Sequence, residues 1–372
     1  MRALKVAWDN SLSGRDQGGT GVYSARLLEQ FAKRTDLRME ILQGKQQNST
    51  ANGIIRRGWG TFGNLLWTHA SLPRLLRRLN ADLLHAPAFI APLIAPCPVV
   101  MTVHDISYLL YPSHFSQWWA IYLKGIMPRM LSSAAAIVCV SEHSKQETIA
   151  AYNVPGHRFY VIPNGVDHER FHPGVALDFE WARSLGIREN YVLHVGAFSY
   201  RKNIPVLLRA IAHLRRKPIW KNRQLVLAGP PDLALKGADE IFETIQELEL
   251  SENVVLTGHI PNQHLPGLYA HAALLAMPSL YEGFGLPVLE AMASGTPVVA
   301  SNAASLPEVA GGAAILFPTQ DHLALADSIE DVLEHRSVAG ELREKGLRRA
   351  QQFSWQRAAE ETVAVYRAVA KP

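Results

Sequence analysis

The chain alternates short, nearly continuous apolar runs with longer runs in which apolar residues recur every three or four positions. The short runs predict strands buried on both faces, and the longer runs predict amphipathic helices. In the first half the pattern predicts strands at 4–8, 39–42, 81–86, 98–105, 135–141 and 159–165, with helices at 25–34, 71–80 and 144–152. In the second half it predicts strands at 191–196, 223–229, 253–258, 274–279, 296–301 and 313–317, with helices such as 204–216 and 239–249.

Two such series predict two domains, because strands that alternate with helices form parallel sheets covered on both faces. The predicted fold class is therefore α/β, with two doubly wound domains facing a deep cleft. A polar stretch with a Pro-Gly pair and no strand period separates the two series. The predicted division is a first domain at 1–170, a linker at 171–188, a second domain at 189–353 and a C-terminal helix at 354–372 that crosses back to the first domain.

The length of 372 residues exceeds one ordinary core and agrees with two domains. Cys97 and Cys139 lie far apart without metal-type spacing, so we expect a reduced, cytosolic protein without a disulfide framework. The opening apolar run is too short for a signal peptide. The longest apolar stretch, 83–103, is broken by four prolines, which argues against a membrane-spanning helix.

The net charge of +4 is unevenly distributed. Residues 1–170 hold 18 Lys and Arg against 11 Asp and Glu, whereas the remainder holds 19 against 22. A basic first domain suits an anionic acceptor or an anionic membrane surface. Ordinary scatter of solvated charges explains the imbalance equally well, so the charge leaves both interpretations open.

The most informative stretch is EGFGLPVLEAMASGTPVVAS, residues 282–301. Pro287 fits the first position of a helix, and Leu286 before it has no oxygen to cap the first turn. Gly283 and Gly285 let the backbone approach a ligand closely. Because the first N–H groups of a helix need partners and attract negative charge, this stretch predicts an anion site that suits a diphosphate.

Two acids flank the predicted helix start. Glu290, about one turn in, would face ribose hydroxyls, and Glu282 would face hydroxyls of a sugar beyond the phosphate. The alternatives are an acid that stabilises the helix dipole and a plain surface acid. Arg201 and Lys202 directly follow a predicted strand and would supply cations for the diphosphate. The alternative for this pair is a solvated basic turn, with Asn203 starting the next helix.

GAFSYRKNIPVLLRA and the 282–301 stretch together resemble the second domain of a retaining glycosyltransferase of the GT4 class, which has the GT-B fold. The two acids match the E-x7-E motif of that family. VSEHSKQETIAAYNVPGHRFYVIPNGVD resembles the segment that ends the first domain, and FSWQRAAEETVAVYRAV resembles the closing helix, so the resemblance covers nearly the whole chain. It implies two Rossmann-like domains, of which 1–170 binds the acceptor and 189–353 binds a nucleotide-sugar donor.

The resemblance implies a role for each motif residue of the second domain. Glu282 would bind hydroxyls of the donor sugar, and Glu290 would bind the nucleotide ribose. Arg201 and Lys202 would contact the diphosphate as catalytic cations. Some relatives carry another arginine at the place of Ala197, so here the diphosphate depends more on the basic pair.

Backbone groups complete the implied donor site. The amides that would hold the distal phosphate and the sugar are those around Gly283, Phe284, Gly285 and Leu286. The residues that would line the base pocket are His259, Ile260, Gly229 and Pro230. In the first domain, a glycine-rich turn before a helix would pass close to the diphosphate, with an ordinary strand–helix loop as the alternative. This turn consists of Gly18, Gly19, Thr20 and Gly21.

His104 and Asp105 follow a predicted strand of the first domain. By the resemblance, His104 lies by the reacting carbon and hydrogen-bonds a sugar hydroxyl, with Asp105 as a contact beside it. A histidine satisfied within a partial core is the alternative. Ser141 would contact the acceptor or the sugar, but an N-cap of the following helix is a strong alternative. His143 and Ser144 share that ambiguity.

The implied reaction transfers a sugar from a nucleotide diphosphate sugar to an acceptor hydroxyl, with retention at the anomeric carbon. No metal or other cofactor is expected, because no Asp-x-Asp cluster or set of metal ligands stands out. A two-carboxylate glycosidase explains the two acids but neither the uncapped helix nor the basic pair. A nucleotide-sugar 2-epimerase of the same fold is an alternative that would need an acid/base set around the nucleotide sugar and would consume no acceptor. A non-catalytic sugar-nucleotide-binding subunit is another, and the presence of all the implied site residues argues against it; these are Glu282, Glu290, Arg201, Lys202 and His104.

TVHDISYLLYPSHFS together with GAFSYRKN is similar to bacterial mannosyl- and rhamnosyl-type transferases of surface polysaccharide synthesis, such as O-antigen and lipopolysaccharide. This favours GDP-mannose or a related GDP-sugar as donor, with UDP-, dTDP- and ADP-sugars open, and a glycan or lipid-linked glycan as acceptor. No nucleic-acid partner is expected. Peripheral contact of a cytoplasmic protein with the anionic inner face of the membrane is a further hypothesis. It rests on Arg56, Arg57, Arg74, Arg77, Arg78, Trp59, Trp118 and Trp119, of which the last two also suit a core or a lid.

Overall fold

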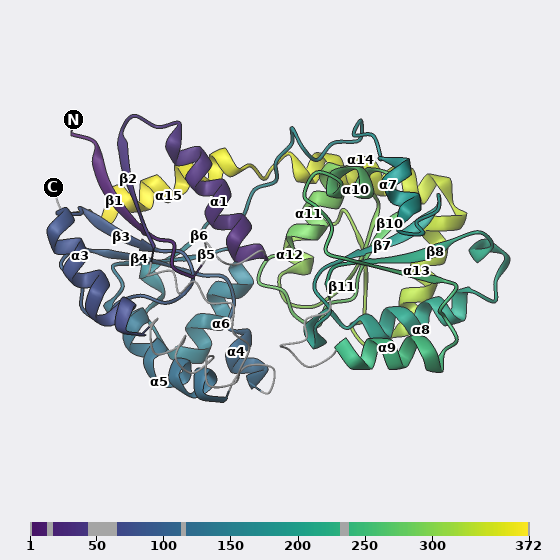
Figure 1. Ribbon diagram of the computed structural model, residues 1–372, viewed down its shortest axis with the longest axis horizontal. Helices are drawn as coiled ribbons and strands as arrows, with labels where there is room; N and C mark the ends of the chain where they lie inside the picture. The colour runs from purple at the N-terminus through teal and green to yellow at the C-terminus, as the bar shows by residue number, and fades with distance from the viewer. Residues whose placement is uncertain (1, 13–17, 44–64, 113–116, 231–237, 371–372) are drawn as a thin grey trace. The chain divides into compact units, whose positions relative to one another are not determined.

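The structure, a computed structural model, describes residues 2–12, 18–43, 65–112, 117–230 and 238–370. By its internal contacts the chain divides into two compact units (Figure 1). The first unit combines Met1–Gly165 with Trp355–Pro372, and the second unit is Val166–Ser354.

The first unit holds, among the described residues, a six-stranded parallel sheet in the order β2-β1-β3-β4-β5-β6. Its strands are β1 (Leu4–Asp9), β2 (Leu37–Leu42), β3 (Leu83–Ala86), β4 (Val99–Val103), β5 (Ala136–Cys139) and β6 (Phe159–Val161). Every residue of β3, β4 and β5 is buried. Burial on both faces explains why these strands appear in the sequence as continuous apolar runs.

The second unit holds, again within the described part of the chain, a six-stranded parallel sheet in the order β12-β11-β10-β7-β8-β9. Its strands are β7 (Tyr191–Val195), β8 (Gln224–Ala228), β9 (Val254–Gly258), β10 (Leu274–Met277), β11 (Val298–Ser301) and β12 (Ile315–Phe317). The chain builds outward from β7 through β8 and β9, and then returns to add β10, β11 and β12 on the other side. The switch between β7 and β10 positions the site, because ligands of doubly wound sheets bind beyond the strand carboxyl ends at such a point.

Helices flank the first sheet, and the last helix of the chain is one of them (Figure 1). They are α1 (Gly19–Ala32), α3 (Leu72–Leu79), α4 (Ser107–Leu110), α5 (Gln117–Ser133), α6 (Glu142–Tyr152) and α15 (Trp355–Val369). Helix α15 packs against α1: the rings of Tyr366 and Phe31 are 5.8 Å apart, and those of Trp355 and Tyr23 are 6.3 Å apart. The predicted return of the C-terminal helix to the first domain is confirmed.

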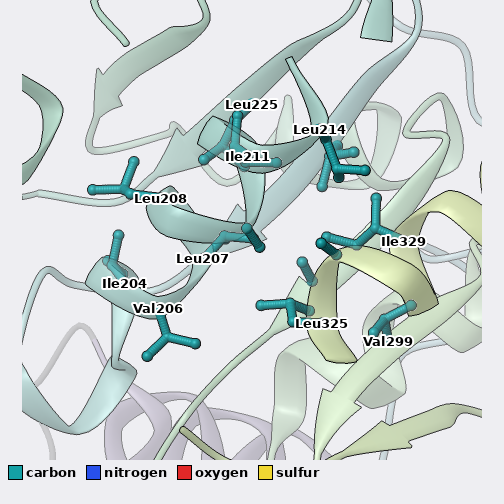
Figure 2. Packing of buried hydrophobic residues seen from close by; sticks show 14 of the residues in the cluster. Ile204, Val206, Leu207, Leu208, Ile211, Leu214, Leu225, Val299, Leu325 and Ile329 are labelled. Carbon is teal, nitrogen blue, oxygen red and sulfur yellow. The ribbon is translucent and has the colours of Figure 1, made fainter. Parts of the chain in front are cut away.

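Helices of the second unit are α7 (Phe179–Ser184), α8 (Ile204–Leu214), α9 (Ala238–Glu247), α10 (Leu265–Ala270), α11 (Leu286–Ala293), α12 (Leu306–Ala310), α13 (His322–Glu334) and α14 (Arg336–Ala350). Figure 2 shows the buried cluster in which α8 meets α13, with Leu225 of β8 and Val299 of β11 in the same core. Ile204, the first residue of α8, is fully buried in this core. Because Ile204 closely follows Arg201 and Lys202, its packing in the core fixes the position of the basic pair after β7.

The predicted α/β fold with two doubly wound sheets is confirmed, but the start of the first helix was predicted wrongly. The helix predicted at 25–34 begins at Gly19, where the amide of Val22 donates to the carbonyl of Gly18 at 3.1 Å. Residues 19–21 are therefore the first helical turn and not a turn that precedes the helix. Glycine costs a helix about 1 kcal/mol relative to alanine, so propensity placed the start too late.

Candidate functional site

The loops after β7 and β10 bring predicted donor residues of the second unit to one edge of its sheet. Arg201 and Lys202 lie on a short 3-10 helix after β7, and Glu282 lies in the loop after β10. Strands β7 and β10 pair in parallel at the switch point, so their carboxyl ends are adjacent. The amide of Leu280 donates to the carbonyl of Arg201 at 2.8 Å and joins the two loops.

Glu282 is the centre of a partly buried polar cluster. Its Oε1 accepts hydrogen bonds from Nζ of Lys202 at 2.7 Å and from Oγ of Ser279 at 2.8 Å. The side chains of Lys202 and Glu282 are each 13% exposed. Burial by itself raises the pKa of Glu282, but the charges of Lys202 and Arg201 and the two hydrogen bonds outweigh it and lower that pKa. Glu282 is therefore an ionised acceptor at neutral pH.

Glycines at the ends of β7 and β8 make room for this cluster. A Cβ on Gly196 would lie 2.7 Å from Cε of Lys202, and a Cβ on Gly229 would lie 2.1 Å from the carbonyl oxygen of Gly196. Both glycines have positive φ angles, 152° for Gly196 and 155° for Gly229. The stem of Lys202 thus lies directly against the backbone, and its ammonium reaches Glu282.

Helix α11 begins without a side-chain cap, as the sequence predicts. Gly285 is the N-cap with φ 103°, Leu286 and Pro287 open the helix, and no side chain in the described part of the chain caps it. The φ angle of Gly285 favours glycine, and a Cβ there would lie 2.8 Å from Cδ2 of Leu306, which would have to shift. The amides of the first turn keep the positive end of the helix dipole, which suits an anion. Gly283 and Phe284 lie in the loop just before this start.

Glu290 lies within α11 and is half-buried. The hydroxyl of Tyr269 donates to its Oε2 at 2.9 Å. Burial, followed by the nearby charge of Glu290, raises the pKa of Tyr269 well above its ordinary value, so this hydroxyl stays protonated. Sequence reasoning missed Tyr269, which belongs to a different helix, α10.

The residues predicted to meet the base lie at the carboxyl ends of β8 and β9. Gly229 and Gly258 are joined by an isolated bridge, and His259 and Ile260 follow directly. The side chain of His259 is exposed, whereas Ile260 is buried. Pro230 accepts a hydrogen bond from the amide of Phe198 at 3.0 Å, which ties this edge to the loop after β7.

In the first unit His104 is held at the carboxyl end of β4. Its Nε2 lies 2.8 Å from the carbonyl oxygen of Pro87 and donates its proton there. The ring of Tyr23, from the second turn of α1, stands edge-on to His104 at 4.8 Å between centroids. The bond to Pro87 and the contact with Tyr23 together hold the orientation of the ring.

A buried chain of hydrogen bonds lies behind Tyr23, and sequence reasoning missed it. The hydroxyl of Tyr23 is 3.0 Å from Oγ1 of Thr102, which is 2.8 Å from Nε2 of His85, and Nδ1 of His85 bonds to the hydroxyl of Tyr366. Burial lowers the pKa of His85 to about 3, so its ring is neutral. Helix α15 is thereby linked through β3 and β4 to the ring that contacts His104.

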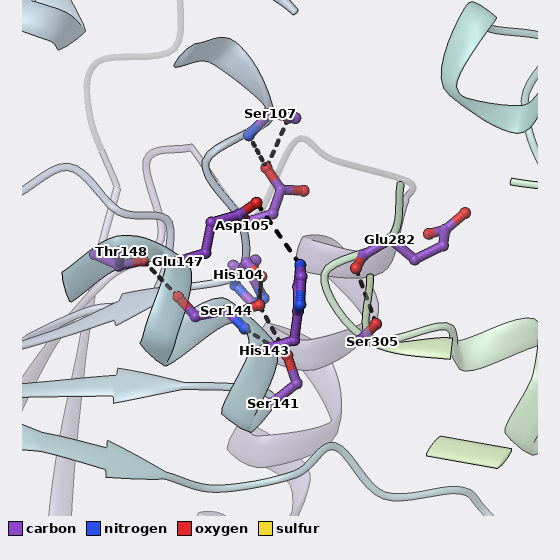
Figure 3. Close-up of polar contacts among 10 residues, drawn as sticks. All are labelled: His104, Asp105, Ser107, Ser141, His143, Ser144, Glu147, Thr148, Glu282 and Ser305. Atoms are coloured by element: carbon purple, nitrogen blue, oxygen red, sulfur yellow. Dashed lines mark hydrogen bonds and ion pairs between the residues drawn. The ribbon is translucent and has the colours of Figure 1, made fainter. Parts of the chain in front are cut away.

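Asp105 and Ser141 use their side chains locally. Oδ1 of Asp105 accepts from the amide of Ser107 at 2.9 Å and from its hydroxyl at 2.6 Å. Oγ of Ser141 accepts from the amide of Ser144 at 3.1 Å and caps α6, so the N-cap interpretation of Ser141 is confirmed. Oγ of Ser144 donates to the carbonyl of His104 at 2.9 Å and joins α6 to the end of β4 (Figure 3).

The remaining candidates are His143 and the residues of the membrane hypothesis. Nε2 of His143 lies 3.7 Å from Oε1 of Glu147, one turn along α6 (Figure 3). Arg74, Arg77 and Arg78 are exposed on α3. The side chains of Arg56, Arg57, Trp59, Trp118 and Trp119 lie outside the described residues.

The described ranges hold neither a metal-binding cluster nor a helix that could span a membrane. They contain no group of three or more His, Cys, Asp or Glu side chains that could hold a metal ion. Within those same ranges no helix has the length and apolarity needed to cross a membrane.

Models of two protein families match the chain in succession. The model described as Glycosyltransferase Family 4 matches residues 17–170, and the model described as Glycosyl transferases group 1 matches residues 178–353. O-antigen chain mannosyltransferase B of Escherichia coli is 32% identical over 296 residues, which cover 78% of this chain and 76% of that protein.

Solved structures share the fold of the whole chain. Sucrose-phosphate synthase from Thermosynechococcus elongatus has a TM-score of 0.78 at 22% identity and covers 98% of both chains. Anabaena HepE in complex with UDP and glucose has a TM-score of 0.76 at 20% identity, over 98% of this chain and 100% of that one. At such identities these likenesses show the fold alone.

Proposed function

The chain belongs to glycosyltransferase family 4, the group 1 glycosyltransferases, and from this membership we propose that it transfers mannose or a related sugar from a GDP-sugar. As a member it has the GT-B fold and is a retaining hexosyltransferase. The proposed acceptor is a glycan, or a glycan carried on a lipid, in bacterial surface polysaccharide synthesis. The name of the Escherichia coli relative, an O-antigen chain mannosyltransferase, supports both the sugar and the acceptor class.

One observation carries the proposal: the cluster of Lys202, Glu282 and Ser279 lies at the same sheet edge as the uncapped start of α11. An ionised carboxylate suits sugar hydroxyls, and a helix start beside cations suits a diphosphate. Both features lie at the switch point of a doubly wound sheet, where ligands bind. A glycosidase pair of carboxylates needs neither the helix start nor the cations.

In this proposal each part of the donor meets its own residues. Glu282 accepts hydrogen bonds from the sugar hydroxyls. Glu290, oriented by Tyr269, accepts them from the ribose. The amides of residues 283–286 hold the distal phosphate and the sugar. The residues assigned to the base are Gly229, His259 and Ile260.

The proposed step breaks the bond between the anomeric carbon and the diphosphate oxygen and forms a bond from the acceptor oxygen to the same face of that carbon. The departing diphosphate gains negative charge, which Arg201, Lys202 and the amides of α11 stabilise. The acceptor hydroxyl gives its proton to an oxygen of that diphosphate. No metal or other cofactor takes part in this proposed step.

The first unit supplies the acceptor side of the proposed site. His104, held by Pro87 and Tyr23, hydrogen-bonds a sugar hydroxyl. The backbone at the start of α1, Gly19 and Thr20, is assigned to the diphosphate. Asp105 and Ser141 are assigned to the acceptor or the sugar, in addition to the local hydrogen bonds that their side chains form.

A thermal-shift screen tests the donor. The protein is mixed with GDP, UDP, dTDP or ADP, or with their common sugar conjugates, with and without EDTA. We expect selective stabilisation by GDP and GDP-mannose, of about 2.7 kcal/mol at a hundredfold excess over Kd, and no effect of EDTA. Stabilisation by another nucleotide would reassign the donor, and stabilisation by none of them would contradict a nucleotide-sugar site.

We also propose that the first unit contacts anionic membrane through the exposed arginines of α3, which are Arg74, Arg77 and Arg78. Each arginine near an anionic surface contributes about 1 kcal/mol. Flotation with phosphatidylglycerol vesicles is expected at low salt and should be lost at high salt and in the triple glutamine variant. Vesicles of phosphatidylcholine are the control. Absent flotation, or flotation that salt does not change, would reject this contact.

A further inference from the structure

The amides of residues 283–286 need a fixed orientation if they hold the donor, and the two glycines among them have no side chain to provide it. We propose that Ser305 is the positioning residue that orients these amides and thereby the distal phosphate and the sugar. The catalytic consequence rests on the proposed function. The orientation itself is a property of the unliganded protein and can be measured separately.

Ser305 lies between β11 and α12, and its side chain is fully buried. Its Oγ donates to the carbonyl oxygen of Glu282 at 2.8 Å and to the carbonyl oxygen of Phe284 at 2.9 Å. Figure 3 shows the contact with Glu282. One hydroxyl proton is thus shared between two carbonyls of the same loop, which are two residues apart.

The helix that follows Ser305 does not account for these bonds. Ser305 occupies the N-cap position of α12, where a serine ordinarily accepts a hydrogen bond from an amide of the first turn. Its side chain forms no such cap bond. Ala304, just before it, has φ 50°, a left-handed conformation that is unfavourable for alanine. In this conformation the hydroxyl of Ser305 bonds the carbonyls of the 282–284 loop and does not cap α12.

The two carbonyl contacts have a consequence for the neighbouring amides. In a planar trans peptide, a carbonyl and the N–H of the next residue point in opposite directions. Fixing the carbonyls of Glu282 and Phe284 therefore orients the N–H groups of Gly283 and Gly285 away from Ser305. Both amides then point to one side of the loop, an arrangement that stabilises negative charge when it develops.

The same segment contacts the loop at two further points. Oγ of Ser301 donates to the carbonyl of Ser279 at 2.5 Å, and the side chain of Leu306 packs against Gly285. Ser279 in turn donates to Oε1 of Glu282. Residues 301–306 therefore support the loop at several points, and the bonds of Ser305 hold the two carbonyls that share peptide planes with the N–H groups of Gly283 and Gly285.

Hydrogen exchange of the unliganded protein tests the orientation. In Ser305→Ala we expect the peptide that covers residues 281–286 to exchange about 10-fold faster than in the wild type, because the loop loses the two bonds that oppose its local opening. Ser328→Ala is the matched control, since Oγ of Ser328 donates to the carbonyl of Ala324 within α13 at 2.7 Å. The control should leave exchange of the loop unchanged.

Calorimetry and kinetics test the consequence for the donor. The probes are GDP, UDP, dTDP and ADP, each compared with the monophosphate of the same base. Ser305→Ala should weaken diphosphate binding about 10-fold and lower kcat/KM for the sugar donor on the order of 10²-fold, with monophosphate affinity unchanged. A merely structural role would lower Tm and weaken both classes of nucleotide together.

Conservative variants of Ser305 distinguish loss of the hydroxyl from misfolding of the protein. Ser305→Thr keeps the hydroxyl and should recover most of the lost kcat/KM. Ser305→Cys is close to serine in size but a weak donor, so it should resemble Ser305→Ala. If the alanine variant does not fold, the threonine and cysteine variants give the same comparison.

Each outcome decides a separate point. Unchanged exchange in Ser305→Ala overturns the orientation of the loop by Ser305. Faster exchange with wild-type diphosphate affinity and wild-type kcat/KM overturns its role in positioning the donor. If the wild-type protein binds none of the nucleotides, the proposed function fails, and hydrogen exchange still decides whether Ser305 orients the loop.

Discussion

Replacing Glu282 by alanine is expected to lower kcat/KM on the order of 10³-fold while nucleoside diphosphate binding persists. The variant loses the carboxylate proposed to bind the sugar hydroxyls. It also removes the acceptor that holds Nζ of Lys202 at 2.7 Å. An ammonium released from Glu282 is available to a diphosphate, so GDP affinity should stay within about 3-fold of the wild type or increase.

Glu290→Ala is the matched control, because it removes the other carboxylate of the E-x7-E motif, whose proposed partner is the ribose. Diphosphate affinity itself should fall in this variant, by roughly 10-fold. Glu290→Gln keeps an acceptor for the hydroxyl of Tyr269 and separates loss of that contact from loss of charge. Calorimetry with GDP, paired with steady-state kinetics, distinguishes the two roles, and an equal loss of nucleotide affinity in both alanine variants would contradict them.

Much of the fold could be predicted because its strands are buried on both faces. β3, β4 and β5 are wholly buried and therefore appear as uninterrupted apolar runs. The start of α11 could also be predicted, since the sequence there combines two glycines, a proline and no capping side chain. Helix α5 was not predicted; it holds Pro128 in its interior, where proline is normally unfavourable.

The contacts within the candidate site could not be predicted, because they depend on strand order. Lys202 and Glu282 are far apart in the chain and meet only because β7 and β10 are neighbours in the sheet. A lysine after a strand looks the same in sequence whether it bonds a carboxylate or a phosphate. Ser305 and Tyr269 were missed for the same reason, since a serine or a tyrosine carries no local pattern that names its distant partner.

Replacing Lys202 by methionine is expected to reduce both stability and catalysis. The change keeps an unbranched stem over Gly196 and removes the ammonium from a pair whose side chains are each 13% exposed. Removing one partner of a pair that is largely shielded from solvent leaves the other charge uncompensated and costs about 3 kcal/mol, the lower end of the range for buried pairs. For a unit of this size that lowers Tm by roughly 6 to 12 °C. The lost stabilisation of the diphosphate should lower kcat/KM on the order of 10²-fold.

The loss of stability should depend on pH with a definite sign. In the wild type, burial raises the pKa of Glu282, but Lys202, Arg201 and the hydrogen bonds outweigh burial and lower it. The stabilisation is therefore present above the ordinary pKa of 4.5 and is lost as the pH falls through the lower folded-state value. In Lys202→Met the pKa of Glu282 rises, so its ionised form destabilises the fold at neutral pH. The difference in Tm from the wild type should be largest near pH 7 and shrink toward about pH 4.

Arg201→Gln is the matched control for this prediction, because Arg201 lowers the pKa of Glu282 through its charge. It should reduce kcat/KM with a smaller fall in Tm than Lys202→Met. An equal fall in Tm for Lys202→Met at both pH values would attribute the loss to packing of the stem and not to charge. GDP affinity that falls in Lys202→Met but holds or increases in Glu282→Ala would mean that the carboxylate and the diphosphate compete for the same ammonium.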